Sequence, residues 1–132
     1  MHYDDNEPIR ERLCDLIRGQ GYRVEYRNGL YRVCDDKTRS SRCLCIRVKK
    51  TATYHKKTGR HEYGIDWLSF ARLCDIDRRT PAAVLFYDAT AREAYWGKVF
   101  ELADAVRVWE AEDDADSTVF VPRDLLRLFA RW

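Results

Sequence analysis

The chain lacks any apolar run long enough to cross a membrane. Its longest apolar runs, such as residues 81–87, are far shorter than the roughly 20 residues that a membrane-spanning helix needs. Residues 1–5 also lack the basic and apolar regions of a secretory signal peptide. We therefore expect a cytoplasmic location, either for a protein of the cell itself or for a protein of a virus that infects the cell.

The sequence also lacks the cysteine pattern of a disulfide-stabilised protein. It has five cysteines, an odd number without a signal peptide, so we expect most of them to be small buried hydrophobes. Neither a glycine-rich phosphate loop nor a G-x-S-x-G elbow is present. With 132 residues, 45% of them hydrophobic, the chain is long enough for one domain with a real core, residues 1–132.

The small net charge of +2 conceals two segments of opposite sign. Residues 21–61 contain twelve basic and three acidic residues, whereas residues 101–118 contain seven acidic residues and one arginine. Such an asymmetry favours a polyanionic partner for the basic segment. The alternative is that both segments are simply solvated faces, because lysine and arginine usually lie at the surface.

The first half of the chain has the pattern of a helix followed by three strands. Asn6 is placed to cap a helix that has Pro8 in its first turn and ends near Gly19. Alternating strands over residues 22–27 and 30–34 flank Asn28-Gly29, a strong hairpin signal. A third strand is expected over residues 43–49.

The second half continues the mixture of helices and strands. Residues 50–63 form a basic segment that reads as an extended hairpin or a mobile flap, and Asp66 then begins a helix. Residues 81–87 read as a central strand, 93–100 as its antiparallel partner, and 118–121 as a last strand. Residues 101–109 fit a short helix or a strand, and Pro122 begins a C-terminal helix. We predict an α/β fold with a mixed central sheet flanked by helices.

Two acidic residues and one lysine form the best candidate for chemistry. Asp35 and Asp36 end the second strand, and Lys49 ends the third, so we expect a carboxylate beside a lysine. A carboxylate supplies the hard oxygen ligands that a divalent metal ion needs, and a lysine steadies a water nucleophile or developing phosphate charge.

This arrangement resembles the PD-(D/E)XK nuclease superfamily, in which a helix, a strand with Asp, a strand with (D/E)-x-K, a helix and a further strand follow one another. The resemblance implies a restriction-endonuclease-like fold. It also implies phosphodiester hydrolysis with Mg²⁺, in which Asp36 (or Asp35) would be the metal ligand and Lys49 the motif lysine.

The residue two positions before Lys49 departs from that pattern. The family has an acidic residue or Gln there, whereas this chain has Arg47, whose guanidinium repels a cation and argues against a normal active site. Either another carboxylate, from Glu25, Asp35 or Glu62, replaces the missing one, or the domain binds nucleic acid without cleaving it, or the resemblance is false.

Cysteine and histidine side chains offer a rival chemistry. Cys43 and Cys45 share one strand face, and His55 and His61 follow, which are residue types that bind zinc. The C-x-C spacing differs from the usual zinc knuckle and puts the two cysteines about 7 Å apart along a strand, so zinc is not expected. Cys45 beside either histidine is the sole plausible nucleophilic pair.

The basic segment suggests contact with DNA or RNA. Its cations are interleaved with threonine, tyrosine and histidine, which suit phosphate contacts and base stacking. The residues expected to bind nucleic acid are Arg39, Arg42, Arg47, Lys50, Lys56, Lys57 and Arg60. The alternative is a non-catalytic interaction protein, such as a phage-encoded inhibitor of host defence, whose acidic stretch Glu110–Asp116 either imitates phosphates or docks on a basic protein partner.

Overall fold

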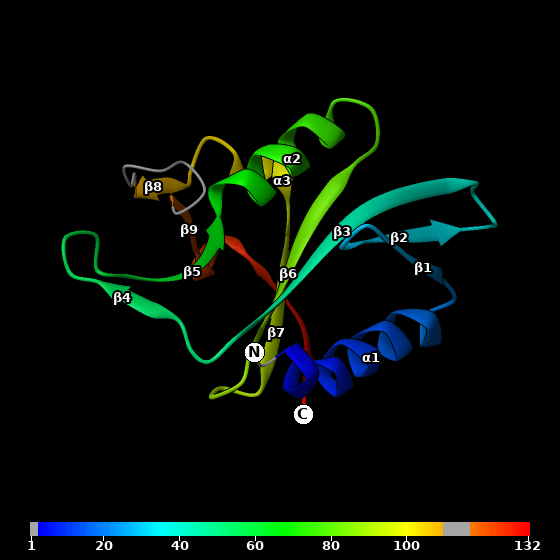
Figure 1. Cartoon of the computed structure of the whole chain (residues 1–132), viewed down its shortest axis with the longest axis horizontal. Coiled ribbons are helices and arrows are strands. Elements are labelled where there is room, and N and C mark those ends of the chain that lie inside the picture. The colour runs from blue at the N-terminus through cyan, green and yellow to red at the C-terminus, as the bar shows by residue number, and fades with distance from the viewer. Residues whose placement is uncertain (1–2, 110–116) are drawn as a thin grey trace.

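The computed structural model describes residues 3–109 and 117–132. Its centre is a six-stranded sheet of order β1-β2-β3-β6-β7-β10 (Figure 1). The strands of this sheet are β1 (Arg23–Arg27), β2 (Leu30–Asp35), β3 (Ser40–Lys49), β6 (Ala82–Asp88), β7 (Glu93–Lys98) and β10 (Arg127–Arg131). Neighbouring strands of this sheet pair antiparallel, except β3 and β6, which are parallel from Cys43↔Ala82 to Lys49↔Asp88.

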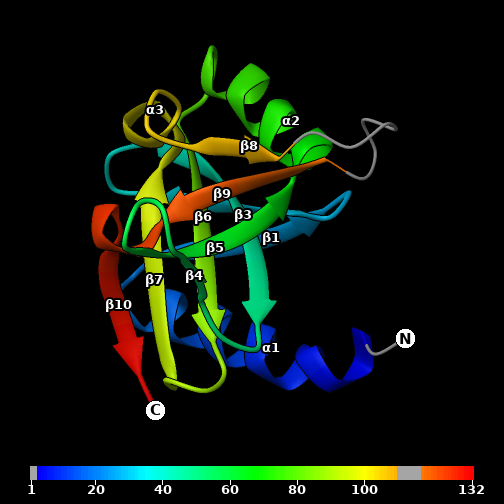
Figure 2. The same cartoon turned by 90° about the vertical axis from the view of Figure 1, so that its left-hand side faces the viewer.

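A second, smaller sheet lies across one face of the first. It is antiparallel, of order β4-β5-β9-β8, and Figure 2 shows it in front of β6 and β7. Its strands are β4 (Thr53–His55), β5 (Arg60–Asp66), β8 (Arg107–Trp109) and β9 (Thr118–Pro122). The connection from β3 to β6 therefore contains the β4–β5 hairpin and the helix that follows it.

The helices of the described residues divide between the two faces of the large sheet. They are α1 (Tyr3–Gly19), α2 (Trp67–Asp77) and α3 (Val99–Leu102). Helix α1 packs Leu13 and Ile17 against Ile46 and Leu85. Helices α2 and α3 share the opposite face with β5 and β9. None of these helices has the length and apolar character needed to span a bilayer, among the residues that the structure describes.

The side-chain alternation expected for β3 is confirmed. Leu44 and Ile46 are buried beneath α1, whereas Cys45 is buried with Phe70 and Leu73 of α2 on the other face. Strand β6 is buried along its whole length, as its continuous apolar sequence indicates for a strand covered on both faces. The basic segment after Lys49 is a hairpin, which was one of its two expected forms.

The prediction of a C-terminal helix after Pro122 is wrong. Residues Arg123–Leu125 form one 3₁₀ turn, and β10 then pairs with β7. The apolar residues here serve both faces of the sheet, because Leu126 packs on the α2 side whereas Phe129 and Trp132 pack on the α1 side. A helix would gather them on one side. The free edge of β7 gives the segment a ladder of hydrogen bonds instead.

Two further expectations need correction. Helix α1 already includes Asn6, so this residue does not cap it. The expected single central sheet is two sheets, since β5 pairs with β9 and β9 with β8, apart from the six-stranded sheet. Residues 101–109, which fitted a helix or a strand, contain both, as the end of α3 and as β8.

The β1–β2 turn depends on its left-handed backbone, which gives a test of the fold. Asn28 and Gly29 have φ angles of 53° and 81°, as the Asn-Gly signal predicts. We expect Gly29→Ala to lower the free energy of unfolding by about 1–2 kcal/mol, because an L-residue is strained there. Gly19→Ala is the control, since Gly19 ends α1 with nothing within 4 Å of an added Cβ. Urea titrations showing equal effects for both variants would contradict this account.

Candidate functional site

The structure does not bring together the aspartates predicted to bind a metal ion and the lysine predicted to lie beside them. Strands β2 and β3 are antiparallel, so Asp35 lies opposite Ser40 at the start of β3, nine residues before Lys49. At a rise of about 3.3 Å per residue the two ends are about 30 Å apart. Asp36 instead accepts hydrogen bonds from Arg23, at 3.2 and 3.4 Å. The expected Mg²⁺ site of Asp36 beside Lys49 therefore does not form.

Glu25 and Glu62, two of the carboxylates that could replace the missing metal ligand, pair with arginines instead. Glu62 is buried and accepts a hydrogen bond from Arg107 at 2.7 Å, and Glu25 pairs with Arg23 on β1. Across residues 3–109 and 117–132, no three His, Cys, Asp or Glu side chains gather closely enough to hold a metal ion. The described residues therefore do not fit the Mg²⁺ site that the resemblance implies.

The cysteines and histidines also lie apart. Burial raises the pKa of the Cys43 and Cys45 thiols, which pack in the core, so neither is an activated thiolate. His61 packs against Tyr54 on the hairpin, with ring centroids 5.1 Å apart, and His55 Nδ1 lies 3.2 Å from Thr58 Oγ1.

Arg47 of β3 contacts the beginning of helix α2. Arg47 Nη2 donates a hydrogen bond to Ser69 Oγ at 3.0 Å and lies 3.4 Å from Asp66 Oδ1. Asp66 caps α2 by accepting from the Ser69 backbone N–H at 3.0 Å, as its position in the sequence predicts. Partial burial opposes ionisation of Asp66, but the bonds from Ser69 and the Arg47 charge together lower its pKa.

Lys49 lies on the same face of β3 as Arg47, and its charge is less compensated than that of Arg47. Its side chain is half-buried, and within the described residues no hydrogen bond or ion pair engages its amine. Burial lowers the pKa of Lys49, and the neighbouring Arg47 charge lowers it further, while Asp66 acts in the opposite direction. A bound anion would offset both the burial of the Lys49 charge and its repulsion by Arg47, because it would pair with a charge that has no partner among the described residues.

A cleft of about 780 Å³ leads to Arg47 from the side of α1. The β1–β2 hairpin ends at Leu30, so β3 continues beyond its partner strand and leaves Ile46 and Arg47 at an open edge. The cleft contains four arginines and three carboxylates, namely Arg10, Arg18, Arg47, Arg72, Glu7, Glu11 and Asp15. No local pattern predicts that α1 and Arg72 lie beside Arg47, because only the tertiary fold brings them together.

The β4–β5 hairpin carries the second group of cations. Figure 1 shows it projecting from the body of the molecule directly after β3. Lys56 and Lys57 occupy its turn, and Tyr54 is 54% exposed beside them. Arg60 lies 4.0 Å from Asp124. The hairpin therefore presents exposed positive charge and an aromatic ring together.

The expected nucleic-acid residues separate into two groups. Arg47 and Lys50 belong with the hairpin cations at the carboxyl end of β3. Arg39 lies in the β2–β3 turn at the other end, and the Arg42 guanidinium covers Trp96 at 5.3 Å from its ring centroid. The acidic stretch Glu110–Asp116, expected to face a protein partner, lies outside the described residues.

Comparisons of this chain with family models, with curated proteins and with solved structures found no match.

Proposed function

We propose that this chain binds DNA or RNA without cleaving it, on a scaffold organised like that of the PD-(D/E)XK nucleases. The order of elements supports the proposal, since a helix, strands, a second helix and a further strand follow one another as α1, β1 to β3, α2 and β6, with the β4–β5 hairpin inserted before α2. The parallel pairing of β3 with β6 and the placement of α1 and α2 on opposite faces also support it.

One observation carries the binding function. Arg47 and Lys49 lie side by side on one face of β3, and Lys49 has no counter-ion among the described residues. A guanidinium and an ammonium at this spacing suit two oxygens of a phosphate backbone. Arg47 also occupies the position where the related pattern has a metal-binding carboxylate, so the same strand favours phosphate contact over hydrolysis.

The test is the affinity of fluorescently labelled nucleic acids for a variant that lacks both cations. We expect Arg47→Ala/Lys49→Ala to weaken binding about tenfold in 50 mM salt, which corresponds to one charged hydrogen bond of about 1.5 kcal/mol. Single-stranded DNA, duplex DNA and RNA of one sequence would be compared by anisotropy. Each is also incubated with Mg²⁺ or Mn²⁺ to detect cleavage.

A matched control removes two arginines at the end of α2 that is remote from Arg47 and Lys49. Arg78 and Arg79 follow α2 and have side chains that are 81% and 82% exposed. Arg78→Ala/Arg79→Ala should change the affinity by less than about twofold. Equal losses in both double variants, or no binding by the wild-type chain, would contradict the proposal. Cleavage that depends on Lys49 would contradict the non-catalytic part.

Exposed apolar residues support a second candidate function, contact with a protein partner. Phe100 of α3 is 76% exposed, and Val108 and Trp109 of β8 are 41% and 55% exposed. Large apolar side chains exposed near one another commonly mark interaction sites. A chain that binds no nucleic acid in the assay above would favour this candidate.

A further inference from the structure

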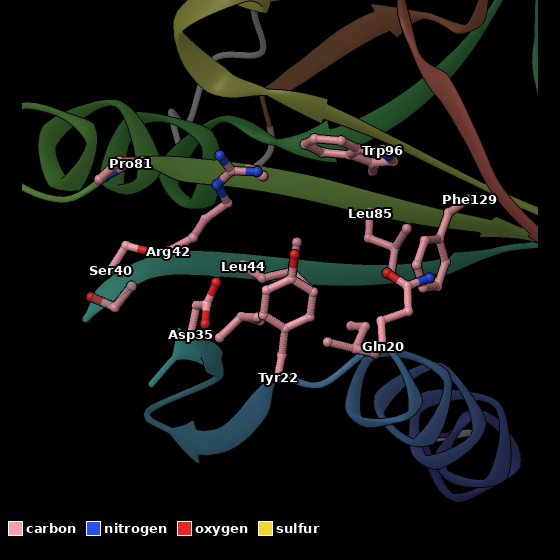
Figure 3. Close-up of a pocket in the computed structure, with 14 residues that line it drawn as sticks. Gln20, Tyr22, Asp35, Ser40, Arg42, Leu44, Pro81, Leu85, Trp96 and Phe129 are labelled. Atoms are coloured by element: carbon pink, nitrogen blue, oxygen red, sulfur yellow. The ribbon is translucent and has the colours of Figure 1, made fainter. Parts of the chain in front are cut away.

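A second cavity lies at the opposite end of the large sheet from Lys49. It measures about 360 Å³, opens to solvent and is lined by the end of α1, by Gln20 and Tyr22 before β1, and by the α1-facing side of the sheet (Figure 3). Its floor is apolar, made of Val33, Leu44, Ala83, Leu85 and Phe129. The volume is near the lower end of the roughly 300–1,000 Å³ typical of small-molecule sites.

Two charged groups face this cavity without pairing with each other. Asp35 lies opposite Ser40 and Arg42 opposite Val33, so the two share a face as diagonal neighbours. Such positions are about 7–8 Å apart. Figure 3 shows the Arg42 side chain reaching across β6 toward Trp96, away from Asp35. One end of the cavity therefore offers an acceptor and a separate donor.

Both groups keep unused hydrogen-bonding capacity. Asp35 Oδ1 accepts from the Lys37 backbone N–H at 3.0 Å, and no partner is present for Oδ2 in the described part of the chain. Arg42 makes no ion pair or hydrogen bond there either, and its guanidinium lies over the Trp96 ring, 5.3 Å from the ring centroid. A cation–π contact positions the guanidinium while leaving its N–H groups free to donate.

A bound molecule must therefore be planar enough to lie on the apolar floor, and must present donors to Asp35 and acceptors to Arg42. Guanine meets both requirements. Its N1–H and N2–H₂ groups suit a carboxylate, and its O6 and N7 atoms suit the arginine fork. Adenine presents the acceptor N1 where guanine has N1–H, so it would face Asp35 with repulsion. The Tyr22 ring, which points into the cavity between Asp35 and Gln20, adds an aromatic wall (Figure 3).

We propose that this cavity binds a guanine base, held by Asp35 on one edge and Arg42 on another. The base comes either from a free nucleoside or from a nucleic-acid strand, and the chemistry of recognition is the same. The proposal does not depend on phosphate binding at Arg47 and Lys49.

The test uses nucleosides, which carry no phosphate. Isothermal titration with 2′-deoxyguanosine and 2′-deoxyadenosine should show at least tenfold tighter binding of the guanine compound, the effect of one lost hydrogen bond and one repulsive contact. Asp35→Asn and Arg42→Ala should each reduce this preference to below about threefold. Asp15→Asn, an exposed carboxylate on α1, is the control and should keep the preference.

Two further arms identify the source of the base and separate this proposal from the previous one. If the base comes from a strand, one guanine within an oligothymidine should raise affinity, and Asp35→Asn should remove the gain. If only the free nucleoside binds, the oligonucleotides will bind equally. Arg47→Ala/Lys49→Ala should retain nucleoside binding. Equal affinity for both nucleosides, no binding of either, or an unchanged preference in a folded Asp35→Asn variant would overturn the proposal.

Discussion

Replacing Phe86 by alanine is expected to lower the free energy of unfolding by about 3–5 kcal/mol. Phe86 is fully buried in the middle of β6, between Arg47 of β3 and Tyr95 of β7. Its ring stacks on Tyr63 of β5, with centroids 5.1 Å apart and planes 21° apart. Phe86 therefore joins the two sheets, and its loss leaves a cavity between them.

Urea denaturation followed by circular dichroism measures this effect. The matched control is Phe100→Ala, since Phe100 is 76% exposed and its removal should cost less than about 0.5 kcal/mol. If Phe86→Ala does not fold, Phe86→Leu keeps most of the volume and should lose about 1–2 kcal/mol. Similar losses at positions 86 and 100 would show that the interface between the sheets contributes little to stability.

The features that the sequence predicted well are those that depend on neighbouring residues. The Asn28-Gly29 turn requires only two residues that tolerate positive φ, and Asp66 needs only Ser69 three positions later to cap α2. The burial of β6 follows from its own unbroken apolar run. Such signals are complete within a few residues, so they survive in any fold that contains the element.

The features that the sequence predicted badly depend on pairing between distant segments. The end of β2 was expected beside the end of β3, but an antiparallel hairpin places Asp35 beside Ser40. The apolar residues after Pro122 fit a helix until β7 offers an edge for β10. No local sequence pattern indicates that the edge of β7 is free to pair with β10.

The candidate site combines one feature that the local sequence predicts with others that depend on pairing between distant segments. That Arg47 and Lys49 share a face follows from the period of two in a strand. The contacts of Arg47 with Asp66 and Ser69 do not, because nineteen or more residues separate these partners in the chain. The guanine cavity was also missed, since Asp35, Arg42 and Trp96 converge only when the four strands β2, β3, β6 and β7 are assembled.

Neutralising the two lysines at the tip of the β4–β5 hairpin is expected to have the largest effect on nucleic-acid binding. Lys56 and Lys57 are exposed, and the described residues offer them no acidic partner, whereas Arg60 already lies 4.0 Å from Asp124. Each lysine that contacts a phosphate releases about one counter-ion when the complex forms. Lys56→Gln/Lys57→Gln should therefore lower the salt slope of log K by about two units.

The slope follows from anisotropy titrations of one labelled oligonucleotide at several salt concentrations up to 1 M. If wild type and variant converge near 1 M salt, a difference of two units amounts to about a hundredfold weaker binding at 0.1 M. Arg78→Gln/Arg79→Gln removes the same charge from the end of α2 and should leave the slope unchanged. A slope that falls equally in both variants would mean that net charge alone attracts the strand. In that case Lys56 and Lys57 make no phosphate contacts of their own, and the hairpin is not the binding element.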